Sequence, residues 1–125
     1  MIELDGVRKT YGRTVAVDRI DLRVEAGELV GLIGHNGAGK TTVLKMLAGQ
    51  LLPTEGSIRI AGVDVRADPG GARRKLGYVP EEPALYDYLT AREFLEFVVQ
   101  VLRSGDVGAA LEMTGLAEDA DRLIR

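Results

Sequence analysis

The chain has 125 residues, a net charge of −3 at pH 7 and no cysteine. The length suits one domain of about 100–200 residues, and the lack of cysteine excludes disulfide bonds and thiolate metal sites. The well-mixed charges do not form the basic face typical of nucleic-acid binding, so we expect no nucleic-acid partner. No apolar run approaches the roughly 18 residues of a membrane span. The N-terminus does not have the basic leader and following apolar stretch of a signal peptide, so we expect none.

Alternation of apolar and charged residues predicts the first strands. It occurs at residues 2–5 and again, more clearly, at 19–25, with a period of two that is typical of half-buried, antiparallel strands. Residues 29–33 are continuously apolar apart from Gly31, which predicts a strand buried on both faces. A further short apolar strand is expected at 76–79, where Pro80 ends it.

The spacing of apolar residues predicts a helix from Thr41 to Ala48 that stops at Gly49. Residues 57–65 are typical of a hairpin around Ala61-Gly62. In the second half, the run 90–93 (TARE) fits a capping box, in which two side chains satisfy each other's backbone amides. We therefore expect a helix from Thr90 to about residue 102, a second over 106–113 and the start of a third over 117–124.

The segment Gly34–Thr41 (GHNGAGKT) matches the phosphate-binding pattern G-x-x-x-x-G-K-[ST]. It lies between an expected buried strand and an expected helix, which is the context that the motif requires. Glycines let the backbone curl with its amides around phosphate oxygens, and the helix N-terminus adds free amides and the positive end of a dipole. We expect Lys40 to reach the β and γ phosphates and the Thr41 hydroxyl to hold Mg²⁺.

A glycine-rich turn without a ligand would need one or two glycines, whereas this loop has three at fixed spacing, followed by Lys-Thr. His35 is the only histidine of the chain; it occupies a variable position of the motif, so we interpret it as loop filler and not as a base. The candidate nucleotide-binding residues of this segment are Gly34, His35, Asn36, Gly37, Ala38, Gly39, Lys40, Thr41 and Thr42.

The stretch Val17–Val65, with GELVGLIGHNGAGKTTVLKMLAG and PTEGSIRIAGVDV, resembles the ATP-binding domain of ABC transporters. The continuation KLGYVPEEPALYDYLTAREFLEF is similar to the branch that drives ABC-2-type exporters. The resemblance implies an α/β P-loop NTPase core, incomplete in these residues. It places an antiparallel β-subdomain at 1–28 and 57–66, the P-loop core at 29–52 and 75–82, and the start of a helical subdomain at 90–125.

The resemblance also implies ligands and partners. These are ATP and Mg²⁺, a membrane-spanning transporter subunit, and a homodimer or pseudo-dimer of ATP-binding domains in the full-length protein. The expected location is cytoplasmic, peripheral on the inner face of the cell membrane. A soluble ABC-type ATPase that is not linked to a transporter, or a nucleotide-binding fragment without activity, remains the alternative.

Three further site residues follow from the family pattern. Its adenine-stacking aromatic falls on Tyr11, where the alternative is a turn aromatic that packs on the sheet. Val17 would flank the same base, or would simply be a core residue. Glu81 stands where the family usually has a glutamine that binds Mg²⁺ and senses the γ-phosphate; a carboxylate is a good Mg²⁺ ligand, but Glu81 is equally explained as a solvated loop acid.

In the family, the loop before the helix at residue 90 touches the membrane subunit, and Leu85, Tyr86 and Tyr88 are the candidates for that contact. Four features of the family do not occur in the 125 residues: the Leu-Ser-Gly-Gly-Gln-type signature, a second acidic strand, the catalytic Glu and the switch His. Hydrolysis needs an oriented nucleophile as well as charge stabilisation, and Lys40 supplies only the latter. We therefore expect this chain alone to bind ATP without hydrolysing it. Family strands that flank 29–33 are missing too, so that segment should expose apolar faces.

Overall fold

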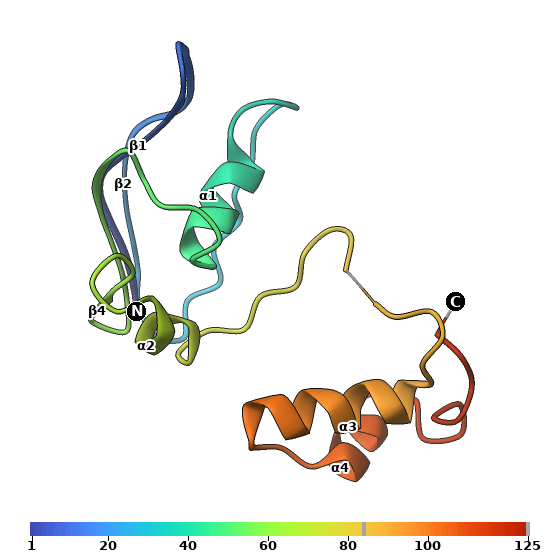
Figure 1. The fold of residues 1–125 in the computed structure, drawn as a ribbon. Coiled ribbons are helices and arrows are strands. Elements are labelled where there is room, and N and C mark those ends of the chain that lie inside the picture. Colours follow the sequence, from blue (N-terminus) through green and yellow to red (C-terminus); the bar gives the residue numbers. More distant parts are fainter. Residues whose placement is uncertain (84, 125) are drawn as a thin grey trace. The chain divides into compact units, whose positions relative to one another are not determined.

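The structure is a computed structural model that describes residues 1–83 and 85–124. It divides into two compact units, Met1–Val79 and Pro80–Arg125. In the described residues, the first unit contains a four-stranded sheet with two helices, and the second contains two helices (Figure 1). None of the described helices is both long enough and apolar enough to cross a membrane.

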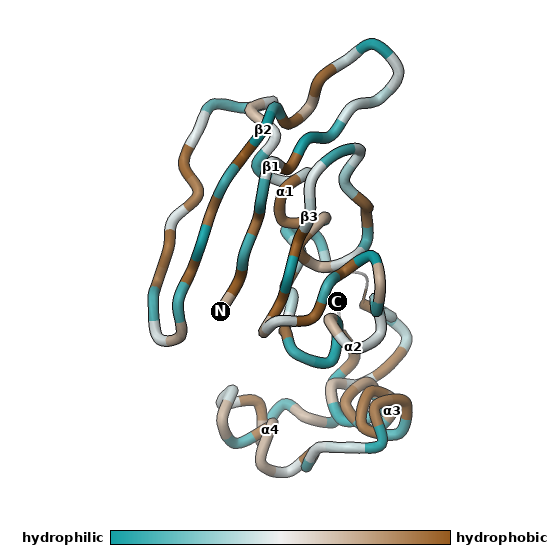
Figure 2. Tube along the Cα trace, turned by 90° about the vertical axis from the view of Figure 1, so that its left-hand side faces the viewer, coloured by the Kyte–Doolittle hydropathy of each residue, from teal (hydrophilic) through white to brown (hydrophobic). Residues whose placement is uncertain are grey.

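The sheet of the first unit is antiparallel throughout, as the alternating sequence predicts. Its strands are β1 (Ile2–Tyr11), β2 (Thr14–Val24), β3 (Glu55–Ile60) and β4 (Val63–Asp64), in the spatial order β2-β1-β3-β4. Hydrophobic and hydrophilic residues alternate along β1, β2 and β3 (Figure 2). The expected hairpin is confirmed: β3 pairs with β4, and Ala61 and Gly62 form the turn with positive φ.

A bulge in β1 shifts the alternation from one face to the other. In a regular strand, Leu4 and Val7 would point to opposite faces of the sheet. Both are buried, because the register of β1 changes between them. Gly6 lies at this point with a φ of +55°, and its amide donates a 2.6 Å hydrogen bond to Asp21 Oδ1 on β2. The bulge therefore brings a second apolar residue of β1 into the core.

The helix α1 (Lys40–Leu47) packs on the sheet and begins one residue before its predicted start. Its Val43 and Met46 side chains are buried against residues of β1, β2 and β3. A short helix that the sequence did not predict, α2 (Pro69–Arg73), follows β4 and is capped by Asp68. The buried core cluster consists of Leu4, Val7, Val17, Val43, Met46, Ile58, Ile60, Val65 and Ala72.

The predicted strands at 29–33 and 76–79 are wrong, since neither segment has strand structure. Leu29 is 101% exposed and Ile33 95% exposed, and Val79 is also largely exposed. A strand that is buried on both faces needs hydrogen-bonded neighbours at both edges, and no described strand pairs with 29–33. The expected exposure of its apolar side chains is confirmed for Leu29, Val30, Leu32 and Ile33.

In the second unit, α3 (Ala91–Leu102) and α4 (Val107–Thr114) confirm two of the predicted helices. The capping box is formed, because Thr90 and Glu93 each accept a hydrogen bond from the other's backbone amide. The predicted third helix over 117–124 is wrong: residues 117–121 form turns, and Leu123 makes an isolated antiparallel bridge with Thr90. The Ala120 carbonyl accepts from the Arg92 amide and the Ile124 amide donates to the Leu89 carbonyl, so this segment bonds to the start of α3.

Candidate nucleotide-binding site

The loop that precedes α1 is curled around the side chain of Lys40. The Lys40 ammonium donates hydrogen bonds to the carbonyl oxygens of Gly34 at 2.5 Å and His35 at 2.8 Å. A second bond closes the loop, from the Ala38 amide to the His35 carbonyl at 3.1 Å. The segment is therefore neither straight nor helical, and it places a fixed positive charge within a ring of backbone.

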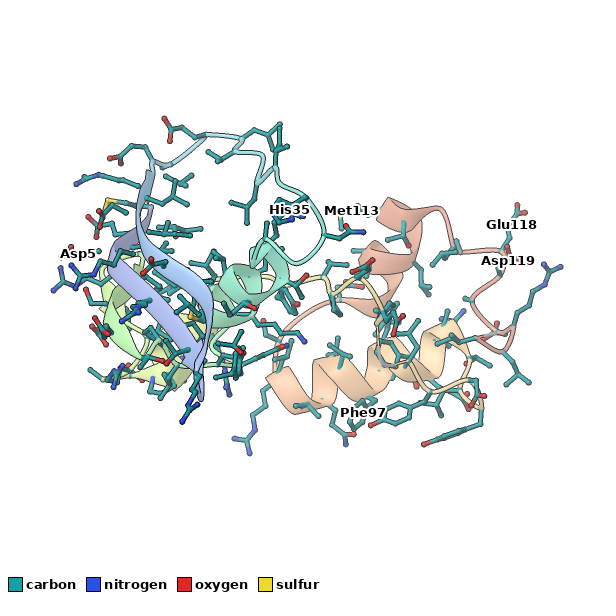
Figure 3. All side chains as sticks on the ribbon, turned by 90° about the horizontal axis from the view of Figure 1, so that it is seen from above. Asp5, His35, Phe97, Met113, Glu118 and Asp119 are labelled. Carbon is teal, nitrogen blue, oxygen red and sulfur yellow. The ribbon has the colours of Figure 1, made fainter. Side chains whose placement is uncertain are left out.

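Most of this ring is open to solvent. Residues 34–38 are exposed, whereas Gly39 and Lys40 are partly buried. His35 lies on the loop (Figure 3), and its Nδ1 is 2.8 Å from the carbonyl oxygen of Asn36. That contact requires a hydrogen on Nδ1 and turns the imidazole toward its own backbone. The interpretation of His35 as a loop residue rather than a base stays a prediction.

Two glycines give the loop its shape. Gly37 and Gly39 have φ angles of +83° and +87°, in the left-handed region that side chains disfavour. Gly39 also packs tightly on β2: a Cβ there would lie 2.3 Å from the Ala16 carbonyl oxygen and 3.1 Å from Val17 Cγ2. A Cβ on Gly37 would meet nothing within 4 Å. Gly37 thus serves the turn alone, while Gly39 also seats the start of α1 against the sheet.

The N-terminus of α1 differs from those of the other described helices. Asp68, Thr90 and Asp106 cap α2, α3 and α4 with their side chains, whereas Gly39 gives α1 no side-chain cap. The first turn of α1 also contains no acidic residue. The first amides of a helix lack partners within the helix, so α1 presents free donors and the positive end of its dipole next to Lys40. This donor set fits an anion with several oxygens, such as a triphosphate.

The two residues expected at the base have different surroundings. Tyr11 ends β1 and is 50% exposed, so half of its surface remains available for a ligand. Val17 is buried in the core cluster at 4% exposure, and its Cγ2 faces Gly39 of the loop. Val17 therefore supports the loop from below the surface, and contact with a base remains a prediction.

The two proposed Mg²⁺ ligands belong to different units. Thr41, at the start of α1, is exposed and lies in the first unit, whereas Glu81 is exposed and lies in the second. Among the described residues, no three His, Cys, Asp or Glu side chains form a group able to hold a metal. Thr41 alone suits a metal that keeps phosphate oxygens and water as its other ligands; the role of Glu81 stays a prediction.

The residues expected to contact a membrane partner are exposed. Leu85, Tyr86 and Tyr88 are 46%, 44% and 68% exposed, and the ring centroids of Tyr86 and Tyr88 are 5.6 Å apart. Tyr86 also packs edge-on against Phe97, which is on α3 (Figure 3), with centroids 6.3 Å apart.

Lys9 is a further residue of this region, and no sequence motif indicates it. The ammonium of Lys9 lies 5.3 Å from the centroid of the Tyr11 ring and donates a 2.8 Å hydrogen bond to the Leu52 carbonyl. The sequence does place Lys9 and Tyr11 two residues apart, a spacing that puts both side chains on one face of a strand. It does not reveal the anchor at Leu52, which is far away in the chain.

A glycine loop curled around a lysine, ahead of an uncapped helix packed on a sheet, defines the class of P-loop nucleotide-binding proteins. The sequence profile of the ABC transporter family matches residues 17–125, so the chain belongs to that family. It is 40% identical to the ABC transporter ATP-binding protein YxlF of Bacillus subtilis, over 99% of this chain and 42% of that protein. It is 37% identical to the bacitracin transport ATP-binding protein BcrA of Enterococcus faecalis, over 95% of this chain and 40% of that protein.

Solved structures agree with the sequence matches. A dimeric bacterial ABC transporter cassette superposes with a TM-score of 0.82 at 30% identity, over 98% of this chain and 61% of that chain. A post-hydrolysis dimer of an ATP-binding cassette, bound to ADP and Pi, gives a TM-score of 0.83 at 29% identity, with the same coverage. The α/β ABC ATPase fold is thereby confirmed for the part that this chain covers. The chain spans 42% and 40% of the two curated relatives.

Proposed function

We propose that this chain binds the triphosphate of ATP, with Mg²⁺, in the loop from Gly34 to Thr42. The observation that carries the proposal is the Lys40 ammonium, held by two loop carbonyls beside an uncapped helix N-terminus. A γ-phosphate oxygen would be a stronger acceptor for the ammonium than a neutral carbonyl, because both partners would be charged. The amides at the start of α1 would donate to the neighbouring phosphate oxygens.

The side chains around the loop have separate roles in this proposal. Lys40 neutralises phosphate charge, the Thr41 hydroxyl is the ligand for Mg²⁺, and Tyr11 stacks on the adenine. Bound Mg²⁺ would neutralise charge on the β and γ oxygens.

For the whole protein, we propose that ATP binding and hydrolysis are coupled to export through a membrane-spanning subunit. Two relatives support this proposal. One is a bacitracin transport ATP-binding protein, and the other is a probable multidrug ABC transporter ATP-binding protein. The solved cassette is described as a dimer, which supports a dimer of ATP-binding domains. The proposed location is peripheral on the cytoplasmic face of the membrane. A soluble ABC-type ATPase without a transporter is the alternative, and co-purification with a membrane subunit separates the two.

We also propose that these 125 residues do not turn over ATP by themselves. Lys40 would stabilise phosphate charge, but the catalytic Glu and the switch His of the family pattern do not occur in the sequence. Phosphoryl transfer needs both contributions. Phosphate release by the wild-type chain should therefore be no faster than by Lys40→Ala.

The test is isothermal titration of the 125-residue chain with MgATP, using Lys40→Ala and the matched control Lys45→Ala. Lys45 is an exposed lysine in the last turn of the same helix. A hydrogen bond to a charged group contributes about 1.5–3 kcal/mol, so Lys40→Ala should bind roughly 10- to 100-fold more weakly. Lys45→Ala should bind like the wild type. Equal weakening by both variants would refute a specific phosphate loop, and far-UV circular dichroism checks that each variant folds.

A further inference from the structure

The Lys9 side chain connects the ring of Tyr11 to the segment that follows α1. Its ammonium lies 5.3 Å from the Tyr11 ring centroid, within the range of a cation–π interaction. The same ammonium donates to the Leu52 carbonyl at 2.8 Å, which fixes its position over the ring. One long side chain is thus held at its charged end by two partners.

This arrangement lies close to the phosphate loop along the sheet. Lys9 on β1 is paired with Val17 on β2. Val17 and its neighbour Ala16 are the residues against which Gly39 packs. Lys9 and the glycine loop are therefore linked through a single strand, β2, and all of these residues belong to the first unit.

We propose that Lys9 is a positioning residue that holds the Tyr11 ring for stacking on the nucleotide base. This inference rests on the proposed function. Tyr11 ends its strand and is half exposed, so its ring has few neighbours to fix its rotamer. The anchored ammonium occupies one face of the ring and directs the opposite face toward a ligand. A cation on one face also draws π-electron density to that side, which favours stacking of an electron-rich purine on the other.

The backbone around Lys9 has other supports, so its side chain is free for this role. The amide of Thr10 donates to Thr54 Oγ1 at 3.1 Å, and the amide of Thr54 donates to the Arg8 carbonyl at 2.8 Å. These two bonds join β1 to the segment after α1 without Lys9. Loss of the lysine should therefore change the orientation of the ring and leave the sheet folded.

The test uses a double-mutant cycle with two ligands, MgATP and inorganic tripolyphosphate, measured by isothermal titration on the 125-residue chain. The variants are Lys9→Met, Lys9→Arg, Tyr11→Leu and Lys9→Met with Tyr11→Leu. An exposed cation–π interaction corresponds to about a twofold to fivefold change in affinity. We expect Lys9→Met to weaken ATP by that factor, to leave tripolyphosphate unchanged, and to have no effect in the Tyr11→Leu background. Lys9→Arg should restore most of the ATP affinity, because guanidinium also stacks on aromatic faces.

Several results would overturn the inference. If Lys9→Met weakens both ligands equally, Lys9 attracts phosphate and does not act through the ring. If Lys9→Met strengthens ATP binding, the ammonium competes with the base for the same face of Tyr11. If the wild type binds tripolyphosphate as tightly as ATP, base stacking is absent while the phosphate site stands. If the wild type binds neither ligand, the proposed function itself fails, and this inference with it.

Discussion

The close approach of Gly39 to β2 allows one prediction to be worked out from the structure. In Gly39→Ala, the added Cβ would lie 2.3 Å from the Ala16 carbonyl oxygen and 3.1 Å from Val17 Cγ2. The first distance is far below a van der Waals contact. Ala16 lies between Val15 and Val17, which both pair with β1, so its carbonyl has little freedom to move. Either α1 shifts away from the sheet or β2 distorts.

The cost of Gly39→Ala has two parts that a matched variant separates. An alanine in the left-handed region costs about 1–2 kcal/mol relative to the ordinary conformation. Gly37→Ala has the same cost, since its φ is +83°, but its Cβ meets nothing within 4 Å. Forcing an extra methyl group into packed structure costs about 1–3 kcal/mol more. We therefore expect Gly39→Ala to be about 1–3 kcal/mol less stable than Gly37→Ala.

Urea unfolding followed by far-UV circular dichroism measures this difference. The free energy of unfolding of small proteins falls by about 1–3 kcal/mol for each molar increase in urea. The midpoint of Gly39→Ala should lie roughly 1 M below that of Gly37→Ala. Equal midpoints would refute the reasoning, because they would mean that α1 is not seated on β2 through Gly39.

Two further predictions concern the core of the first unit and the capping box of the second. Met46→Ala removes a fully buried side chain and should cost about 2–5 kcal/mol in urea unfolding, whereas Leu44→Ala, at a position 45% exposed on the same helix, should cost much less. In the second unit, the Thr90 amide and hydroxyl donate to the Glu93 carboxylate and lower its pKa below the ordinary value of 4.5. The stabilisation of α3 is therefore complete above that value and is lost as the pH falls through the lower, folded-state pKa. Helix circular dichroism against pH should show less acid loss in Glu93→Gln than in the wild type, and identical profiles would contradict the assigned role.

Features that depend on short stretches of sequence were predictable. The capping box at Thr90 needs only four consecutive residues, and the structure forms it as expected. The hairpin turn at Ala61-Gly62 and the helix after the glycine loop are local in the same sense. In each case, the residues of the element itself determine its structure, and no distant partner is needed.

Features that depend on distant partners were not predictable. The strand expected at 29–33 has the right apolar composition, but strand structure needs hydrogen-bonded neighbours, which the sequence of the segment does not specify. The bulge at Gly6 depends on Asp21 of another strand. The turns at 117–124 depend on bonds to Leu89 and Arg92. The short helix α2 had a local indication, Asp68 as N-cap before Pro69, which the length of the element obscured.

The same distinction explains why the candidate site is formed although the segment before it is not a strand. In the usual picture, a buried strand delivers the chain to the glycine loop, and the helix receives it. Here the loop is held from the helix side: Gly39 is seated on β2, and Lys40 reaches back to the carbonyls of Gly34 and His35. Val43 and Met46 fix the helix itself in the core. The curl of the loop therefore depends on contacts between α1 and the sheet, and the exposed segment 29–33 contributes little to the shape of the loop.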